Sequence, residues 1–272
     1  MTGRLAVAAA LLLALALGSI ALARSLVDRM IFQPTPGADL RPADVGVPGE
    51  DVFLRTEDGV RVHAFWLPAP GASRALLFLH GNAGNASHRL PNAALLVRLG
   101  IHVLLADYRG YGLSEGSPSE EGVYADARAA LRHLVDERGI PERRVVVFGR
   151  SLGGAVAVDL ARERDLGGLI LESTFPSAGE VARSFLGPLA LLAGRRFDSA
   201  AKIGRVRCPL LFFHGDRDTV VPFALGRRLF ERAPGPKAFE TIRGAGHNDT
   251  VEIGGTPYLE RIGRFLDEVA PG

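Results

Sequence analysis

Short apolar runs that alternate with helical patterns constrain the fold of this chain more than any other feature. Residues 75–79 and 145–148 are apolar throughout and residues 101–106 are apolar except for His102, and segments with a helical pattern separate these runs. Apolar strands that alternate with helices are typical of a parallel sheet covered by helices on both faces. The sequence therefore predicts an α/β fold with a mostly parallel central sheet.

The remaining elements extend this pattern from residue 51 to the C-terminus. Residues 52–55 and 60–67 resemble two strands joined by Glu57, Asp58 and Gly59, which predicts an antiparallel hairpin. Further strands are expected at 168–171, 209–213 and 238–242, and helices at 87–99, 119–137, 152–164, 223–232 and 258–269. A chain of 272 residues suits one large domain, which we assign to residues 51–272.

The N-terminus is unusually apolar. Residues 5–23 contain only apolar and small side chains, close to the length of about 20 residues that spans a bilayer as a helix. We interpret residues 1–24 as a membrane anchor and the Pro- and Gly-rich residues 25–50 as a tether. The alternative is an exported protein with a cleaved signal peptide, because residues 21–23 have the A-x-A form of a cleavage site. An apolar core longer than the usual ~7–15 residues of a signal peptide favours the anchor.

Charge and cysteine content exclude several classes of function. The chain has 32 basic and 30 acidic residues, and a net charge of +2 gives no electrostatic reason to expect nucleic acid binding. Cys208 is the only cysteine, so an intramolecular disulfide and a Cys-based metal site are both excluded. Its position before an apolar run predicts a small buried side chain.

The run Gly149-Arg150-Ser151-Leu152-Gly153 lies between a predicted strand and a predicted helix. A serine between two glycines on such a turn is typical of a nucleophile elbow, which exposes the serine hydroxyl. We expect a Cβ at Gly149 or Gly153 to collide where strand and helix crowd together. The alternative is a glycine-rich turn with an incidental serine.

A serine nucleophile needs a general base and an acid that orients this base. His247 follows Gly244-Ala245-Gly246 in a predicted loop near the C-terminus, whereas the other histidines lie in strand, helix or turn patterns. Asp216 and Asp218 follow a buried strand, and either could instead cap the helix that begins near Pro222. We therefore expect His247 as the base and one of the two aspartates as its partner.

Two backbone N–H groups are expected to form an oxyanion hole. One belongs to Leu152, directly after the proposed nucleophile. The other lies in the loop of residues 80–85, which follows a strand and is rich in small residues. We choose the N–H of Asn82, with Ala83 as the alternative.

Five blocks together carry a family resemblance. They are residues 80–85, 107–114, 149–154, 214–218 and 246–249, spread over the whole chain after about residue 50. The chain resembles an α/β-hydrolase of the serine-hydrolase type, from the branch with one N-terminal membrane segment. The resemblance implies the α/β-hydrolase fold, with a short cap after the sixth strand at about residues 175–205. It also implies the triad Ser151, Asp218 and His247, because the family pattern uses the second aspartate of its block.

This resemblance implies a membrane-anchored serine hydrolase that cleaves carboxylic esters or thioesters of small molecules or acylated proteins. It implies neither a metal nor an organic cofactor. The alternatives are a small serine peptidase or amidase with the same triad, and a non-catalytic binding protein of the same fold. Tyr108 and Arg109 are expected to support the active-site loops. Residues 184–194 are apolar and are expected to line an acyl pocket, to contact the bilayer or to form an ordinary buried helix.

Overall fold

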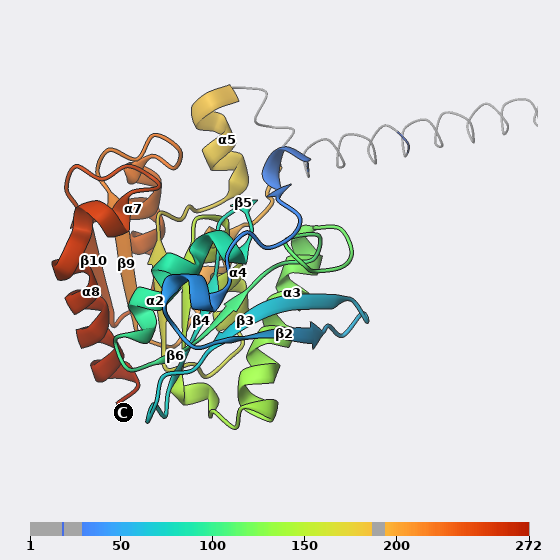
Figure 1. The fold of residues 1–272 in the computed structure, drawn as a ribbon. Coiled ribbons are helices and arrows are strands. Elements are labelled where there is room, and N and C mark those ends of the chain that lie inside the picture. The colour runs from blue at the N-terminus through green and yellow to red at the C-terminus, as the bar shows by residue number, and fades with distance from the viewer. Residues whose placement is uncertain (1–17, 19–28, 187–193, 272) are drawn as a thin grey trace, which may run out of the picture.

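A computed structural model describes residue 18 and residues 29–186 and 194–271 of the chain. Figure 1 shows the labelled elements from the N- to the C-terminus. The strands are β1 (Gln33–Pro34), β2 (Glu50–Arg55), β3 (Arg61–Leu67), β4 (Ala75–Leu79), β5 (Ala83–Gly84), β6 (His102–Ala106), β7 (Val145–Arg150), β8 (Gly168–Glu172), β9 (Leu210–Gly215) and β10 (Lys237–Ile242). The α-helices are α2 (Leu90–Val97), α3 (Glu120–Arg132), α4 (Leu152–Ala161), α5 (Ala178–Leu186), α6 (Ser199–Lys202), α7 (Phe223–Arg232) and α8 (Thr250–Val269).

The described residues form an eight-stranded central sheet in the order β10-β9-β8-β7-β4-β6-β3-β2. Strand β3 pairs antiparallel with β2 and with β6, and all other pairs in this sheet are parallel. The carboxyl ends of the parallel strands therefore meet at one edge, where Leu79 of β4 is in register with Ala106 and Gly149. The predicted α/β fold, with a mostly parallel sheet and an antiparallel hairpin at its start, is confirmed.

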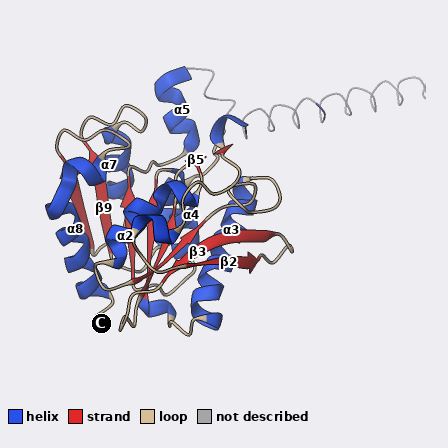
Figure 2. Ribbon diagram, in the orientation of Figure 1, coloured by secondary structure: helices blue, strands red, loops and turns tan. Residues whose placement is uncertain are grey.

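Helices cover both faces of the sheet (Figure 2). Helices α3, α4, α6 and α7 pack on one face, whereas α2 and α8 pack on the other. Each face has its own core of buried apolar side chains. Strands β4 and β7 are buried at every position because they lie in the middle of both cores, which explains the apolar runs of residues 75–79 and 145–148. Cys208 is buried as predicted, and burial raises the pKa of its thiol to about 12.

The last helical segment, α8, consists of two helices that meet at a kink. Gly255, with a φ of 52° and a ψ of −142°, separates a short helix that begins at Thr250 from the longer helix that ends at Val269. The longer helix matches the one predicted at residues 258–269. The short helix before the kink was not predicted, because Gly255 and Pro257 normally end a helical pattern.

The segment before β2 lies against the domain. Strand β1 pairs in parallel with β5, and Phe32 is only 4% exposed. Residues 42–45 form a 3-10 helix that ends at Gly46, where φ is 70°. The described part of the expected tether is thus packed on the loop that follows β4.

The predicted membrane anchor of residues 1–24 lies outside the described residues, apart from Gly18. None of the helices that the structure describes combines the length and the apolar character needed to cross a bilayer. Anchorage through the N-terminus therefore stays a prediction.

Candidate active site

Ser151 occupies the sharp turn between β7 and α4, at the carboxyl edge of the sheet. Its φ of 53° and ψ of −117° are rare for a residue with a side chain. The Ser151 N–H donates to the carbonyl of Glu172 (2.8 Å), and its own carbonyl accepts from Oγ1 of Thr174 (3.0 Å). These contacts on both sides hold the backbone of Ser151 in its strained conformation.

The two glycines of the elbow are required by close packing, as the sequence predicts. A Cβ at Gly149 would lie 2.5 Å from the carbonyl oxygen of Gly153. A Cβ at Gly153 would lie 2.0 Å from the carbonyl oxygen of Leu79 and 2.5 Å from that of His80. The absence of these side chains lets α4 start directly against the end of β4.

The structure brings Ser151, His247 and Asp218 together from three separate loops. Nε2 of His247 lies 3.1 Å from Oγ of Ser151, and Nδ1 of the same ring lies 2.7 Å from Oδ2 of Asp218. With a proton on Nδ1, the ring donates to Asp218 and can accept the proton of Ser151 at Nε2. Within the described residues, no three His, Cys, Asp or Glu side chains are arranged to hold a metal ion.

The two candidate acids have different roles. Asp218 also accepts hydrogen bonds from the N–H groups of Val220 (2.9 Å) and Val221 (2.8 Å). Burial alone would raise the pKa of Asp218, but hydrogen bonds from His214 and His247 outweigh it and hold this pKa well below its ordinary value. Asp216 instead accepts from the N–H of Gly244 (2.7 Å), a contact that supports the loop before His247.

Leu152 and Asn82 each offer a backbone N–H beside Ser151. Among the described residues, neither N–H has a hydrogen-bond acceptor. The loop that carries Asn82 passes close to Ser151, since a Cβ at Gly81 would lie 3.5 Å from Cβ of Ser151. The N–H of Leu152 is unpaired because Leu152 is the first residue of α4. Two free donors next to a nucleophile can stabilise a developing oxyanion.

Hydrogen bonds from other segments of the chain hold the loop that carries Asn82 in place. The carbonyl of Asn82 accepts from the N–H of Gln33 (3.0 Å) and from the hydroxyl of Tyr111 (2.6 Å). Nδ2 of Asn82 donates to the carbonyl of Ile31 (3.0 Å). The hydroxyl of Tyr108 donates to the carbonyl of His80 (2.9 Å), which is consistent with the expected supporting role of Tyr108. The contacts of Ile31, Gln33 and Tyr111 were not anticipated from the sequence.

Arg109 supports the neighbouring loop through a buried ion pair. Its Nε donates to Oδ1 of Asp126 (2.9 Å), and Nη1 donates to Oδ2 of Asp58 (2.7 Å). The Asp126 side chain is only 1% exposed. Arg109 thus ties the loop after β6 to α3 and to the hairpin turn between β2 and β3.

The region of the expected cap follows β8. Helix α5 rises from the carboxyl edge of the sheet (Figure 1), and Phe185 near its end is 59% exposed. Exposure of Phe185 does not fit the interpretation of residues 184–194 as a buried helix. Residues 187–193 lie outside the described residues, so the expected acyl pocket and bilayer contact stay predictions.

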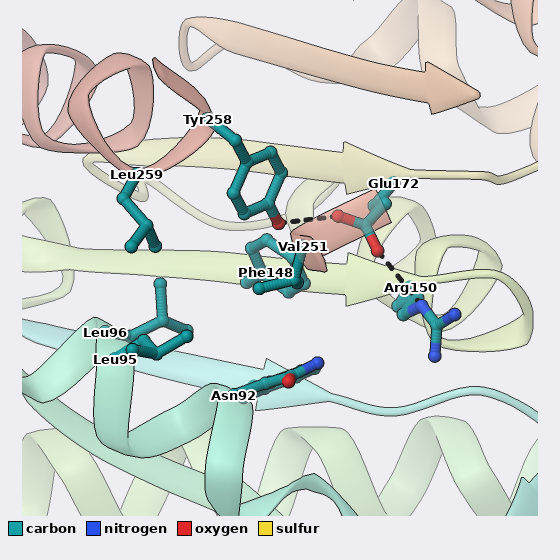
Figure 3. A pocket seen from close by; sticks show the side chains of 10 residues that line it. Asn92, Leu95, Leu96, Phe148, Arg150, Glu172, Val251, Tyr258 and Leu259 are labelled. Carbon is teal, nitrogen blue, oxygen red and sulfur yellow. Dashed lines mark hydrogen bonds and ion pairs between the residues drawn. The ribbon is translucent and has the colours of Figure 1, made fainter. Parts of the chain in front are cut away.

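Arg150 and Glu172 form a buried ion pair beside Ser151. Nε of Arg150 donates to Oε1 of Glu172 (3.0 Å), and the side chains are 6% and 1% exposed. Figure 3 shows this pair at one end of a small pocket with mostly apolar walls. Each of these charged residues ends an otherwise apolar strand, which is the one sequence signal of the pair.

Comparisons with known proteins agree with this architecture. The family model described as serine aminopeptidase, S33, matches residues 71–201. A Mycobacterium tuberculosis protein described as uncharacterized is 40% identical over 246 residues, covering 89% of this chain and 88% of that protein. The α/β-hydrolase domain-containing protein WAV2 of Arabidopsis thaliana is 33% identical over 280 residues, covering 93% of this chain and 91% of its own length. The solved structure of a Pyrococcus furiosus esterase superposes with a TM-score of 0.74 and 23% identity, covering 88% of this chain and 98% of that one.

We predict that Gly153→Ala disrupts the elbow. The added Cβ would lie 2.0 Å from a backbone oxygen, so strand and helix must separate and the unfolding free energy falls by about 1–3 kcal/mol. Urea denaturation followed by circular dichroism measures this loss. Gly204→Ala is the matched control, because a Cβ added at Gly204 would have no described atom within 4 Å apart from its neighbours in the chain. Equal stability of the two variants would contradict the packing described for the elbow.

Proposed function

This chain belongs to the α/β-hydrolase family, and we propose that it is a serine hydrolase of carboxylic esters or thioesters. The observation that carries the proposal is the continuous hydrogen-bonding geometry from Oγ of Ser151 through His247 to Asp218. In this proposal Ser151 is the nucleophile, His247 the general base and Asp218 the acid that orients it.

The proposed reaction has two steps. Oγ of Ser151 attacks the acyl carbon while Nε2 of His247 takes the hydroxyl proton, and the N–H groups of Leu152 and Asn82 stabilise the oxyanion. The protonated His247 then gives its proton to the leaving alcohol or thiol, and an acyl-enzyme remains. Water then attacks the acyl carbon while Nε2 of His247 takes one of the water protons, and His247 gives this proton to Oγ of Ser151 as the bond to the acyl group breaks and the carboxylic acid leaves.

The charge around the elbow supports ester rather than aminoacyl amide substrates. Arg150 directly precedes Ser151, and Nη2 of Arg89 donates to the carbonyl of Ala83 (3.1 Å), the residue after Asn82. Burial, and then the charge of Arg150, lowers the pKa of Arg89. Glu172 neutralises the charge of Arg150, so Arg89 supplies the positive charge that would repel the free ammonium group of an aminopeptidase substrate.

The second candidate function is hydrolysis of amide bonds by the same triad. It is favoured by the match of residues 71–201 to the serine aminopeptidase family model. Rates on matched pairs of an ester and an aminoacyl amide with the same acyl group separate the two functions. We expect turnover of the ester to exceed that of the amide by at least about 100-fold, and the reverse order would overturn the proposed specificity. Aryl esters of increasing acyl length then define the acyl preference.

We predict that Ser151→Ala and His247→Ala each lower kcat on an aryl ester by on the order of 10⁴-fold or more, because triad members act as a unit. Ser151→Ala should also abolish labelling by a fluorophosphonate, and peptide mass spectrometry should locate the wild-type label on Ser151. Turnover retained in Ser151→Ala would contradict the proposed nucleophile. A folded wild-type protein that neither reacts with the fluorophosphonate nor hydrolyses the ester would instead favour a non-catalytic binding protein.

The two aspartates provide a second prediction. Asp218→Asn removes the charge that orients and stabilises His247, so kcat should fall by about 10⁴-fold. Asp216→Asn is the matched control in the same loop, and its effect should stay below about tenfold because the Asp216 carboxylate accepts from the N–H of Gly244 and not from the ring of His247. A larger loss of kcat in Asp216→Asn than in Asp218→Asn would overturn this assignment.

A further inference from the structure

We propose that the ion pair of Arg150 and Glu172 positions His247 for catalysis, so that both are positioning residues of the active site. The inference rests on the proposed function, because it assigns these residues a role in the same reaction. The hydrogen bonds that the structure describes for these two side chains do not reach Ser151 Oγ or the imidazole ring of His247. Their effect must therefore pass through the backbone that carries the ring.

The pair joins the ends of two neighbouring strands. Arg150 is the last residue of β7 and Glu172 the last residue of β8, and the two are in register. Apolar side chains such as Phe78, Phe148 and Leu96 line the pocket beside them (Figure 3). In such surroundings each ion depends on the other, because a single unpaired charge would be strongly unfavourable. The pair is thus confined to one geometry.

Arg150 also binds the loop that carries the general base. Its Nη2 donates to the backbone carbonyl of His247 (2.5 Å) and to Oδ1 of Asn248 (3.1 Å). The guanidinium group is planar and rigid, so the atoms that bind Glu172 and His247 keep a fixed separation. The residue directly before the nucleophile therefore determines where the backbone of His247 lies.

Glu172 holds the other side of the same loop. Its Oε1 accepts from Oγ1 of Thr250 (2.9 Å), and its Oε2 accepts from the hydroxyl of Tyr258 (2.6 Å), as Figure 3 shows for Tyr258. Thr250 and Tyr258 belong to α8, which begins three residues after His247. Glu172 thus links the start of α8 to the same guanidinium group that holds His247.

This network complements the action of Asp218. Asp218 binds Nδ1 and sets the orientation of the ring, whereas Arg150 holds the backbone from which the ring projects. The distance of 3.1 Å between Nε2 of His247 and Oγ of Ser151 depends on both contacts. A misplacement of about 1 Å between reacting groups can lower a rate by about 100-fold. Loss of Arg150 should therefore lower kcat without weakening substrate binding.

The first test compares Arg150→Gln with Arg74→Gln on an aryl ester. Arg74 is a matched control, since its buried side chain also donates to a carboxylate, Asp267 (2.9 Å), and to a backbone carbonyl, Ala270 (3.1 Å). It lies before β4, at the opposite edge of the sheet. We expect kcat of Arg150→Gln to fall by about 10- to 100-fold with KM within about threefold of wild type, and kcat of Arg74→Gln to stay within about twofold.

Two conservative variants separate charge from geometry. Arg150→Lys keeps a cation for Glu172 but lacks the planar fork, so its thermal stability should exceed that of Arg150→Gln while kcat remains at least about fivefold below wild type. Tyr258→Phe removes one donor to Glu172, and we expect kcat to fall by about three- to tenfold. If Arg150→Gln does not fold, these two variants carry the test, and wild-type kcat in both would overturn the proposal.

The decisive readout is whether Arg150 acts through His247. The rate at which a fluorophosphonate labels Ser151 is measured for Arg150→Gln in the wild-type and in the His247→Ala background. A residue that acts through His247 should lose its effect when the imidazole is absent. In the His247→Ala background, the labelling rates with and without Arg150→Gln should therefore differ by less than about twofold. An equal loss of labelling rate in both backgrounds would overturn the proposal.

Failure of this inference differs from failure of the proposed function. If wild type and Arg74→Gln hydrolyse the ester and are labelled at Ser151, while Arg150→Gln retains wild-type kcat, only the positioning role is overturned. If Ser151→Ala retains the wild-type rate, the proposed nucleophile is overturned and the inference falls with it.

Discussion

The strained backbone of Ser151 is the constraint on which the rest of the site depends. A φ of 53° and a ψ of −117° are unfavourable for a serine and persist only where the surroundings determine them. The carbonyl of Glu172 and the hydroxyl of Thr174 hold the two sides of this peptide, and Gly153 lets α4 begin against the carbonyl of Leu79. In this conformation Oγ of Ser151 faces His247, and the N–H of Leu152 stays unpaired beside Ser151.

The central sheet then supplies the partners of Ser151. Because β7, β8, β9 and β10 are parallel, the loops that follow them meet at one edge of the sheet. Asp218 follows β9 and His247 follows β10, while Glu172 ends β8. The buried pair of Arg150 and Glu172 connects the ends of β7 and β8 to the loop that carries His247. The site therefore depends as much on contacts between strand ends as on the three triad side chains.

Much of this arrangement is accessible from the sequence, for identifiable physical reasons. Fully apolar runs mark the buried strands, and Gly149 and Gly153 mark the crowded turn, since both signals are local. Neither spacing nor composition separates Asp216 from Asp218, because both lie in one loop and only the direction of each side chain distinguishes them. The family resemblance favoured Asp218, and in the structure Asp218 lies against Nδ1 of His247 whereas Asp216 accepts from the N–H of Gly244.

The contacts that the sequence did not reveal are long-range and lack a periodic pattern. Gln33 binds Asn82 through its backbone alone, so no side-chain preference signals the contact. Arg150 and Glu172 are neighbours only because β7 and β8 pair in one particular register, which strand patterns do not determine. The short helix that begins at Thr250 was not predicted because Gly255 and Pro257, which follow it, normally indicate the end of a helix.

A crystal structure of the protein after reaction with a fluorophosphonate tests the central claim most directly. The adduct resembles the tetrahedral intermediate that the site is proposed to stabilise. We predict a covalent bond to Oγ of Ser151, with the phosphoryl oxygen accepting hydrogen bonds from the N–H groups of Leu152 and Asn82. An adduct on another residue, or a phosphoryl oxygen that contacts neither N–H, would contradict the account.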